Sequence, residues 1–391
     1  MHIHYTRWAV LTVLGLMTAC HQAPKTAGDM VPDRVIAPMA KARTVEDLTP
    51  YIASATLCPT DGAQDFAVPP FKTLLRPDAF YFLNGSAVWR LSRDGKELRQ
   101  IGRSGRGPGE YLAVEDFCLD VSDSEVLCMT SYRGGGVLRY SAATGEFLGQ
   151  TVPAEMPSTP TGIIPLQDGG FALYFTGFDA PGSTIDPENP AWCLWSYDKT
   201  GAVTGRQLLL TDFNIPFSML RAVTEISPGR YILVPESSYA SCPVFEDGRI
   251  REVLSFDLGP KYLPQGYALQ GGGDPWDRFG DIMDSDYYKL VSNVHMTPKR
   301  ICFSLFGAGG STWCLLSKAN GSQTILWPQI IMTRLLATDG ETFYFGIPPF
   351  AEQDKDNGIF ERDALVSYLV EQGILPFPSY TWQMVAVRFK D

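Results

Sequence analysis

The chain has 391 residues, of which 45% are hydrophobic and 19% are charged, and this apolar content excludes an intrinsically disordered chain. Its formal net charge of −11 argues against nucleic acid as a partner. The length would hold two or three average domains, but a repeat fold can fill it as one domain.

The first twenty residues have the pattern of an export signal. Arg7 is the only charged residue before an apolar run from Trp8 to Ala19, and small residues precede Cys20. A helix needs about 20 apolar residues to span a bilayer, so this shorter run predicts a cleaved signal peptide at residues 1–19. The segment Leu16–Cys20 resembles a bacterial lipobox, which implies acylation of the Cys20 thiol. An ordinary signal peptide with an incidental cysteine is the alternative.

Residues 20–44 are predicted to form a flexible tether between the lipid and the domain, because they mix Pro, Ala, Gly and Lys without a sustained period. His21 stands where lipoproteins retained at the inner membrane usually carry aspartate, so the resemblance implies an outer-membrane lipoprotein on the periplasmic or cell-surface side. Cleavage after residue 19 removes one arginine and leaves a net charge of −12. The acyl chains, rather than electrostatic attraction, would therefore anchor the protein to the membrane.

From residue 45 to residue 391 a unit of two β-hairpins recurs. Short runs rich in aromatic and β-branched residues, such as Ala79–Leu83 and Thr342–Ile347, each follow a turn signal. The turn signals are spaced by 45, 45, 60, 70 and 41 residues, counted at Asp78, Asp123, Asp168, Pro228, Pro298 and Asp339. Propeller blades repeat about every 40–50 residues, so the two wide spacings indicate insertions.

These repeats predict a six-bladed β-propeller of four-stranded antiparallel blades. Two β-sandwich domains are the alternative, but they would not explain six copies of one unit. The sixth unit lacks one strand after Thr381–Lys390. We therefore expect Ile52–Leu57 to pair with Gln383–Phe389 and close the ring, which removes an unpaired sheet edge.

Two segments resemble a known family. The glycine-rich segment Ile101–Tyr111 (IGRSGRGPGEY) and the segment Thr44–Pro59 resemble motifs of the six-bladed propeller lipoproteins of Bacteroidetes-type bacteria. Relatives of that family include NHL-type and TolB-like propellers. The resemblance implies the architecture and an extracytoplasmic location, but no activity, because most members lack an assigned one.

The glycine-rich segment has two interpretations. Its glycines could place backbone amides around an anion, with Arg103 and Arg106 adding positive charge. No Lys-Ser or Lys-Thr pair follows, and Pro108 lacks an amide donor, so a nucleotide loop is excluded. The other interpretation is a tight crossing between blades 1 and 2, in which glycine permits positive φ. Arg103, Arg106 and Glu110 form the first half of the predicted ligand surface.

The insertion at about residues 259–292 supplies the second half of that surface. Aromatic residues among acids suit sugars or cationic groups. The aspartates make Ca²⁺ possible, although their spacing does not match an EF-hand, and no other cofactor is expected. A solvated loop with a short helix capped near Asp281 is the alternative. The residues assigned to the surface here are Trp276, Asp277, Asp281 and Tyr287.

A second insertion, at about residues 348–378, contains Ile359–Gly373, whose apolar residues recur with a helical period. We expect an amphipathic helix that packs on the propeller. His295 stands just before a predicted strand and is expected to be a structural histidine whose hydrogen bonds are satisfied.

Seven cysteines remain after Cys20. Two pairs flank predicted hairpin turns and could form disulfides in an oxidising periplasm. The pairs are Cys118 with Cys128 and Cys302 with Cys314. Free thiols are the alternative.

The sequence therefore predicts a lipid-anchored extracytoplasmic binding module for a small molecule, glycan or protein, and it favours a function other than catalysis. A divalent-metal-dependent hydrolase or lyase with its site at the channel mouth is the alternative. Such an enzyme needs converging carboxylates or histidines, and after cleavage only His21 and His295 remain.

Overall fold

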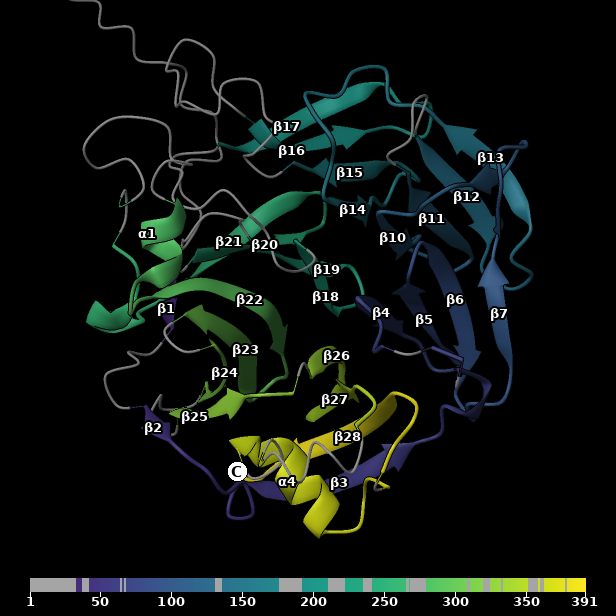
Figure 1. Ribbon diagram of the computed structural model, residues 1–391. Coiled ribbons are helices and arrows are strands. Elements are labelled where there is room, and N and C mark those ends of the chain that lie inside the picture. The colour runs from purple at the N-terminus through teal and green to yellow at the C-terminus, as the bar shows by residue number, and fades with distance from the viewer. Residues whose placement is uncertain are drawn as a thin grey trace, which may run out of the picture.

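The computed structural model describes most of the region predicted to form the propeller. The described residues are 33–36, 42–63, 65–66, 68–130, 136–175, 192–209, 222–234, 241–264, 267, 279–307, 310–318, 324–331, 333–350, 358, 362–376 and 378–391. Six sheets stand around one central axis (Figure 1), which confirms the predicted six-bladed β-propeller.

The strands of each blade follow the chain outward from the axis, except that the outermost strand of blades 4, 5 and 6 comes from the beginning of the chain. Blade 1 is formed by β4 (Lys72–Leu75), β5 (Ala79–Asn84), β6 (Ala87–Ser92) and β7 (Leu98–Ile101). Blade 2 is formed by β10 (Asp116–Leu119), β11 (Glu125–Met129), β12 (Val137–Ser141) and β13 (Phe147–Thr151). Blade 3 is formed by β14 (Gly162–Pro165), β15 (Phe171–Tyr174), β16 (Trp192–Tyr197) and β17 (Val203–Leu209).

The remaining blades contain segments from the beginning of the chain. Blade 4 is formed by β18 (Val223–Ser227), β19 (Arg230–Leu233), β20 (Ser241–Glu246), β21 (Arg249–Phe256) and the added strand β1 (Asp33–Ile36). Blade 5 is formed by β22 (Tyr288–Met296), β23 (Arg300–Gly307), β24 (Gly310–Ser317), β25 (Thr324–Gln329) and the added strand β2 (Arg43–Thr44). Blade 6 is formed by β26 (Arg334–Asp339), β27 (Thr342–Ile347), β28 (Gln383–Phe389) and β3 (Ile52–Cys58).

Each blade is apolar on both faces because it packs between two neighbours. All six residues of β5 and all four of β15 are buried, and their side chains divide between the cores on the two sides of the sheet. This two-sided burial explains why the sequence shows continuous apolar runs instead of strict alternation.

The ring closes as predicted. β3 pairs with β28 in an antiparallel ladder in which Ile52 lies opposite Phe389 and Leu57 lies opposite Val385. The last blade therefore combines three strands from the end of the chain with one from near its beginning, and its outer strand does not depend on any other molecule.

The segment predicted as a flexible tether is partly incorporated into the propeller. β1 pairs in parallel with β21, and β2 pairs in parallel with β25. Parts of residues 20–44 therefore extend the outer edges of blades 4 and 5, and the prediction of a free tether up to residue 44 is corrected at these two places.

The connections between strands differ at the two ends of the channel. At the end where the innermost strands finish, which we call the turn face, the first two strands of each blade are joined by two to five residues. The longer connections, such as residues 102–115, 257–287 and 348–382, leave from the end where the innermost strands begin. We call this end the mouth face. Loops that carry function commonly gather on one side of a rigid scaffold.

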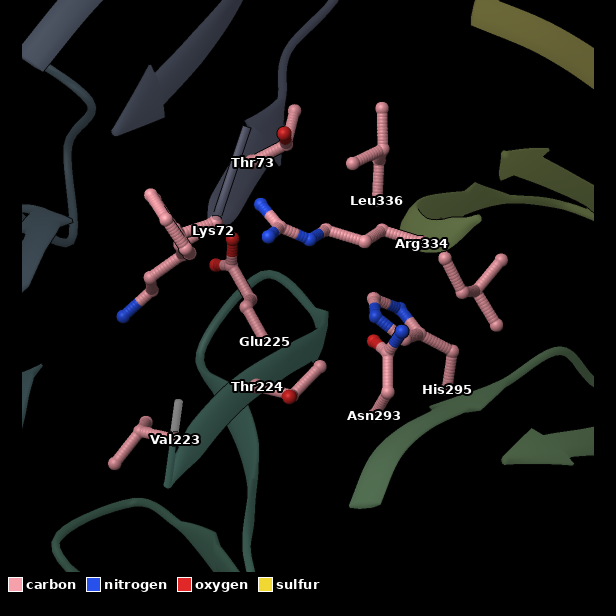
Figure 2. A pocket seen from close by; sticks show the side chains of 11 residues that line it. Lys72, Thr73, Val223, Thr224, Glu225, Asn293, His295, Arg334 and Leu336 are labelled. Carbon is pink, nitrogen blue, oxygen red and sulfur yellow. The ribbon is translucent and has the colours of Figure 1, made fainter. Parts of the chain in front are cut away.

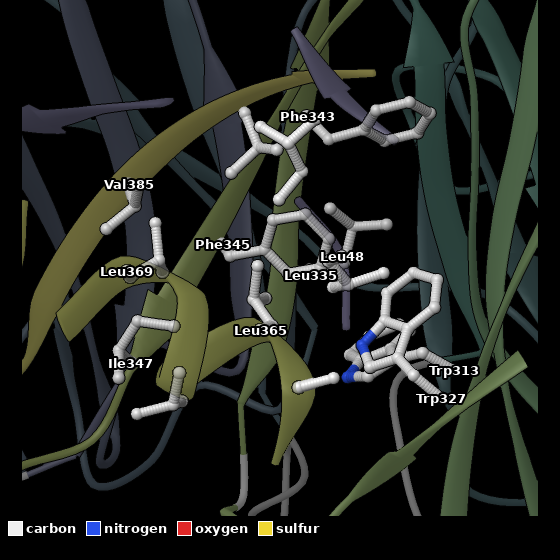
Figure 3. Close-up of a cluster of buried hydrophobic side chains, with 14 of the residues drawn as sticks. Leu48, Trp313, Trp327, Leu335, Phe343, Phe345, Ile347, Leu365, Leu369 and Val385 are labelled. Carbon is white, nitrogen blue, oxygen red and sulfur yellow. The ribbon is translucent and has the colours of Figure 1, made fainter. Parts of the chain in front are cut away.

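Both predicted insertions contain a helix. Within 257–287, α1 (Phe279–Asp284) buries Ile282. Within 348–382, α4 (Ala364–Glu371) begins after Asp363, whose carboxylate accepts a hydrogen bond from the Val366 amide. Leu365 and Leu369 of α4 point into the core of blades 5 and 6 (Figure 3), which confirms the predicted packing helix. Among the described residues, no helix is long and apolar enough to cross a membrane.

Candidate functional site

The glycine-rich segment folds around its own carboxylate. The two-residue strands β8 (Arg103–Ser104) and β9 (Glu110–Tyr111) pair in parallel. The Gly107 amide donates to Glu110 Oε2 at 2.8 Å, and a Cβ at Gly105 would lie 1.9 Å from the same oxygen. The amide that could bind an external anion is therefore occupied by Glu110, which is half-buried within the loop.

The same segment makes the crossing from blade 1 to blade 2. Gly102, with φ of 69°, leaves no room for a side chain because the Tyr140 ring would lie 2.6 Å from its Cβ. The Tyr111 hydroxyl donates to the Ile101 carbonyl at 2.7 Å. The glycines thus permit close packing between the two blades, whereas the Arg103 and Arg106 side chains are exposed.

The predicted ligand surface is not one continuous patch. The glycine-rich segment lies between blades 1 and 2, whereas α1 and Tyr287 lie between blades 4 and 5, across the axis (Figure 1). Asp281 of α1 is exposed, and Tyr287 packs edge-on against Tyr267. Trp276 and Asp277 lie outside the described residues.

The predicted disulfides are not formed in the structure. Cys118 lies opposite Leu127, and Cys128 lies opposite Phe117, so the two thiols point to opposite faces of blade 2. Cys302 and Cys314 are offset by one residue in the same way in blade 5. None of the seven cysteines in the described part of the chain forms a disulfide. Burial raises the pKa of the Cys118, Cys128, Cys302 and Cys314 thiols.

The channel has an ion-pair network at its turn face. Arg76, after β4, donates to both carboxylate oxygens of Glu225 on β18 at 2.9 and 3.1 Å. Its Nε also donates to Asp123 of blade 2 at 2.6 Å. Burial opposes the charge of Arg76, but Glu225 and Asp123 outweigh this effect and raise its pKa. Because blades 1 and 4 face each other across a six-bladed ring, the pair with Glu225 crosses the channel.

A second ion pair lies near the mouth face. Lys72 on β4 lies 2.9 Å from Oδ1 and 3.0 Å from Oδ2 of Asp116 on β10, and both side chains are buried. Asp116 Oδ2 also accepts a hydrogen bond of 3.0 Å from the backbone amide of Ile163 in blade 3. Three consecutive blades are therefore joined through one buried carboxylate.

A small polar cavity of about 30 Å³ lies among the innermost strands of blades 1, 4, 5 and 6 (Figure 2). The polar side chains that line it are Lys72, Thr73, Thr224, Glu225, Asn293, His295 and Arg334. A water molecule occupies about 30 Å³ in the liquid, so this volume is far below that of a typical ligand pocket. The described part of the channel around this cavity is lined mainly by polar side chains.

His295 is buried in the core, but the prediction that its hydrogen bonds are satisfied is not met by the described residues. It is 4% exposed, and burial lowers its pKa to about 3 although the Leu335 backbone opposes this shift. Its Nδ1 atom has no hydrogen-bond partner in the described part of the chain. The Asn293 side-chain amide donates a hydrogen bond to the Leu335 carbonyl and accepts one from the Leu335 backbone amide, each at 2.9 Å.

The mouth face exposes aromatic side chains. Phe71, directly before β4, is 41% exposed. The guanidinium carbon of Arg334 lies 4.2 Å from the centroid of the Phe71 ring, in a cation–π contact. Arg334 also donates to the Pro69 carbonyl at 2.6 Å. Tyr380, in the insertion that carries α4, is 81% exposed. None of these three positions was singled out from the sequence, because only the folded ring brings its loops to one face.

The described residues contain no group of three or more His, Cys, Asp or Glu side chains placed to hold a metal ion. Much of the aspartate-rich segment predicted as a possible Ca²⁺ site lies outside them. Calcium binding therefore remains a prediction from the sequence.

Comparisons with known proteins agree with the architecture. A family model described as "6-bladed beta-propeller" matches residues 83–185. A crystal structure of a Bacteroides fragilis protein, whose name describes it as exported, is similar with a TM-score of 0.67 and 16% identity, covering 91% of this chain and 99% of that one.

Two further solved structures are more distant. U3-55K has a TM-score of 0.44 and 9% identity, with coverage of 87% of this chain and 99% of that one. Virginiamycin B lyase from Staphylococcus aureus has a TM-score of 0.41 and 10% identity, with coverage of 86% and 99%. No curated protein matches this sequence. The chain is a six-bladed β-propeller, and the comparisons assign it no activity.

Proposed function

We propose that the protein is an exported, lipid-anchored binding module that takes a small-molecule, glycan or protein ligand on its mouth face. The observation that carries this proposal is the one-sidedness of the connections, because the long loops and both helical insertions leave the blades at that end. The turn face has short hairpin turns, the buried Arg76–Glu225 pair and a surface pocket of about 260 Å³ between the turns of blades 2 and 3, and it carries no long loop among the described residues.

The chemistry of the mouth face supports binding. Phe71 and Tyr380 expose aromatic rings, and aromatic side chains supply large contact areas at low entropic cost. Arg334 stacks on one side of the Phe71 ring, a contact that restricts the ring's freedom before a ligand arrives. A preordered anchor loses little freedom on binding.

The proposed location rests on the N-terminal sequence. Residues 1–19 have the pattern of an export signal, and Leu16–Cys20 resembles a lipobox. The similar Bacteroides fragilis protein bears a name that describes it as exported, which supports export of this chain too. We propose acylation at Cys20 and residence in the outer membrane. Labelling with radioactive palmitate should mark the wild-type protein and leave the Cys20→Ser variant unlabelled.

The ligand face can be tested separately by site-specific photo-crosslinking in intact cells. A photoreactive amino acid at Tyr380 on the mouth face should give discrete crosslinked products. The same amino acid at Lys96, whose side chain is 75% exposed in the β6–β7 turn of the turn face, is the matched control and should give none. Equal products from both positions, or products from Lys96 alone, would show that the mouth face is not the binding face.

A further inference from the structure

The cavity in the channel touches both ion-pair networks. Lys72 and Glu225 belong to its lining, and each is already neutralised, Lys72 by Asp116 and Glu225 by Arg76. Arg334, the third charged residue of the lining, donates to the Pro69 carbonyl and stacks on the Phe71 ring. Burying an ion without a counter-charge is costly, whereas a neutral occupant needs no counter-charge.

Two atoms of the lining need a partner. His295 Nδ1 and Thr73 Oγ1 are buried and have no hydrogen-bond partner among the residues that the structure describes. His295 is 4% exposed and Thr73 is 8% exposed, so neither side chain reaches bulk solvent. A buried polar atom without a partner costs about 1–3 kcal/mol, and most such atoms in folded proteins are satisfied by protein or by ordered water.

The chemistry of the two atoms defines the occupant. A neutral imidazole has one nitrogen that donates and one that accepts, so His295 Nδ1 needs a partner that can take either role. The Thr73 hydroxyl can also donate or accept. Water can do both, and the cavity of about 30 Å³ has room for it.

We propose that this cavity is an internal hydration site, in which one or two water molecules bond His295 Nδ1 and the Thr73 hydroxyl. The site lies between the inner strands of blades 1 and 5, which do not pair with each other. It shares Phe71 and Arg334 with the mouth face, but its tests report on the water alone, whereas crosslinking at Tyr380 reports on the ligand, so either proposal can fail without the other.

A high-resolution crystal structure of the mature protein tests the site directly. We expect an electron-density peak within about 3.2 Å of His295 Nδ1, with the height of a water oxygen and no anomalous signal. A dry cavity would overturn the proposal, and so would an ion identified by its anomalous scattering.

A substitution gives an independent test. If water bonds Thr73, then Thr73→Val removes one partner of that water and should lower the folding equilibrium constant roughly fivefold. If no water is present, the same change removes an unpartnered hydroxyl and should leave stability equal or higher. Thr56→Val, at an exposed threonine of β3, is the matched control and should be neutral. Equal or higher stability of Thr73→Val relative to this control would refute the site.

Discussion

The ion pair across the channel predicts a large loss of stability when one partner is removed. Arg76→Ala would leave Glu225 buried, with a 3.4 Å hydrogen bond from the Tyr231 hydroxyl as its remaining side-chain contact in the described structure. Removing one partner of a buried pair costs about 3–5 kcal/mol. Asp123 is 43% exposed and can return to water, so its separation from Arg76 adds little.

Thermal unfolding of the mature protein measures this loss. For a domain of this size the entropy of unfolding is about 0.7 kcal/mol/K, so the expected fall in Tm is about 4–7 °C. Replacing both partners, as Arg76→Met with Glu225→Leu, should recover most of the lost stability, because an apolar pair of similar volume removes the buried charge.

The control is an exposed ion pair elsewhere on the ring. Arg251 lies 2.8 Å from Asp247 at the surface of blade 4, and Arg251→Ala should change the free energy of unfolding by less than about 1 kcal/mol. The reasoning is wrong if Arg76→Ala is no more destabilising than Arg251→Ala. It is also wrong if the double replacement is no more stable than Arg76→Ala.

Three further predictions follow from buried groups. Burial raises the pKa of Asp363 to about 6, so this group's contribution to stability is full below pH 4 and is lost as pH rises through 6. Asp363→Asn should remove this loss of about 3 kcal/mol. The prediction is contradicted if the urea midpoints of the wild type and the variant change in parallel from pH 4 to pH 7. Gly102→Ala should lower the free energy of unfolding by about 2–4 kcal/mol, because of the positive φ and the nearby Tyr140 ring. Gly149→Ala is the control, since a Cβ there meets open space, and equal urea midpoints of the two variants would refute the argument. Thiol titration of the denatured protein without Cys20 should find seven thiols, whereas five or three would restore one or both disulfides.

The fold was predictable because its signals are local. Each blade is built from neighbouring hairpins whose turn residues and apolar runs occur in order along the chain. Ring closure was predictable for the same reason, since the sixth unit lacked one strand and Ile52–Leu57 was an unassigned strand-like segment. The packing helix was predictable from the helical period of its apolar residues, whereas its N-cap Asp363 was not singled out.

The contents of the channel could not be predicted because they depend on distant residues. Arg76 and Glu225 are 149 positions apart and meet only when the ring is complete. Nothing near either residue in the sequence distinguishes it from an exposed charge. The same is true of His295, whose neighbours in the cavity come from four blades.

The disulfide prediction depended on the exact register of two paired strands, which the sequence does not reveal. Cys118 and Cys128 lie on adjacent strands, but a shift of one residue in register reverses the face on which a side chain lies. The tether prediction did not allow for pairing, because composition does not reveal that the outer edges of β21 and β25 accept another strand.

The added strands have a mechanical consequence for a protein held at its N-terminus. Tension applied there reaches β1 on blade 4 first, then β2 on blade 5, and only afterwards β3, whose release would open the circle. Two short ladders must detach in succession before the closing ladder carries any load. These two ladders would break first under force, before the closed ring and the proposed ligand-binding face are disturbed.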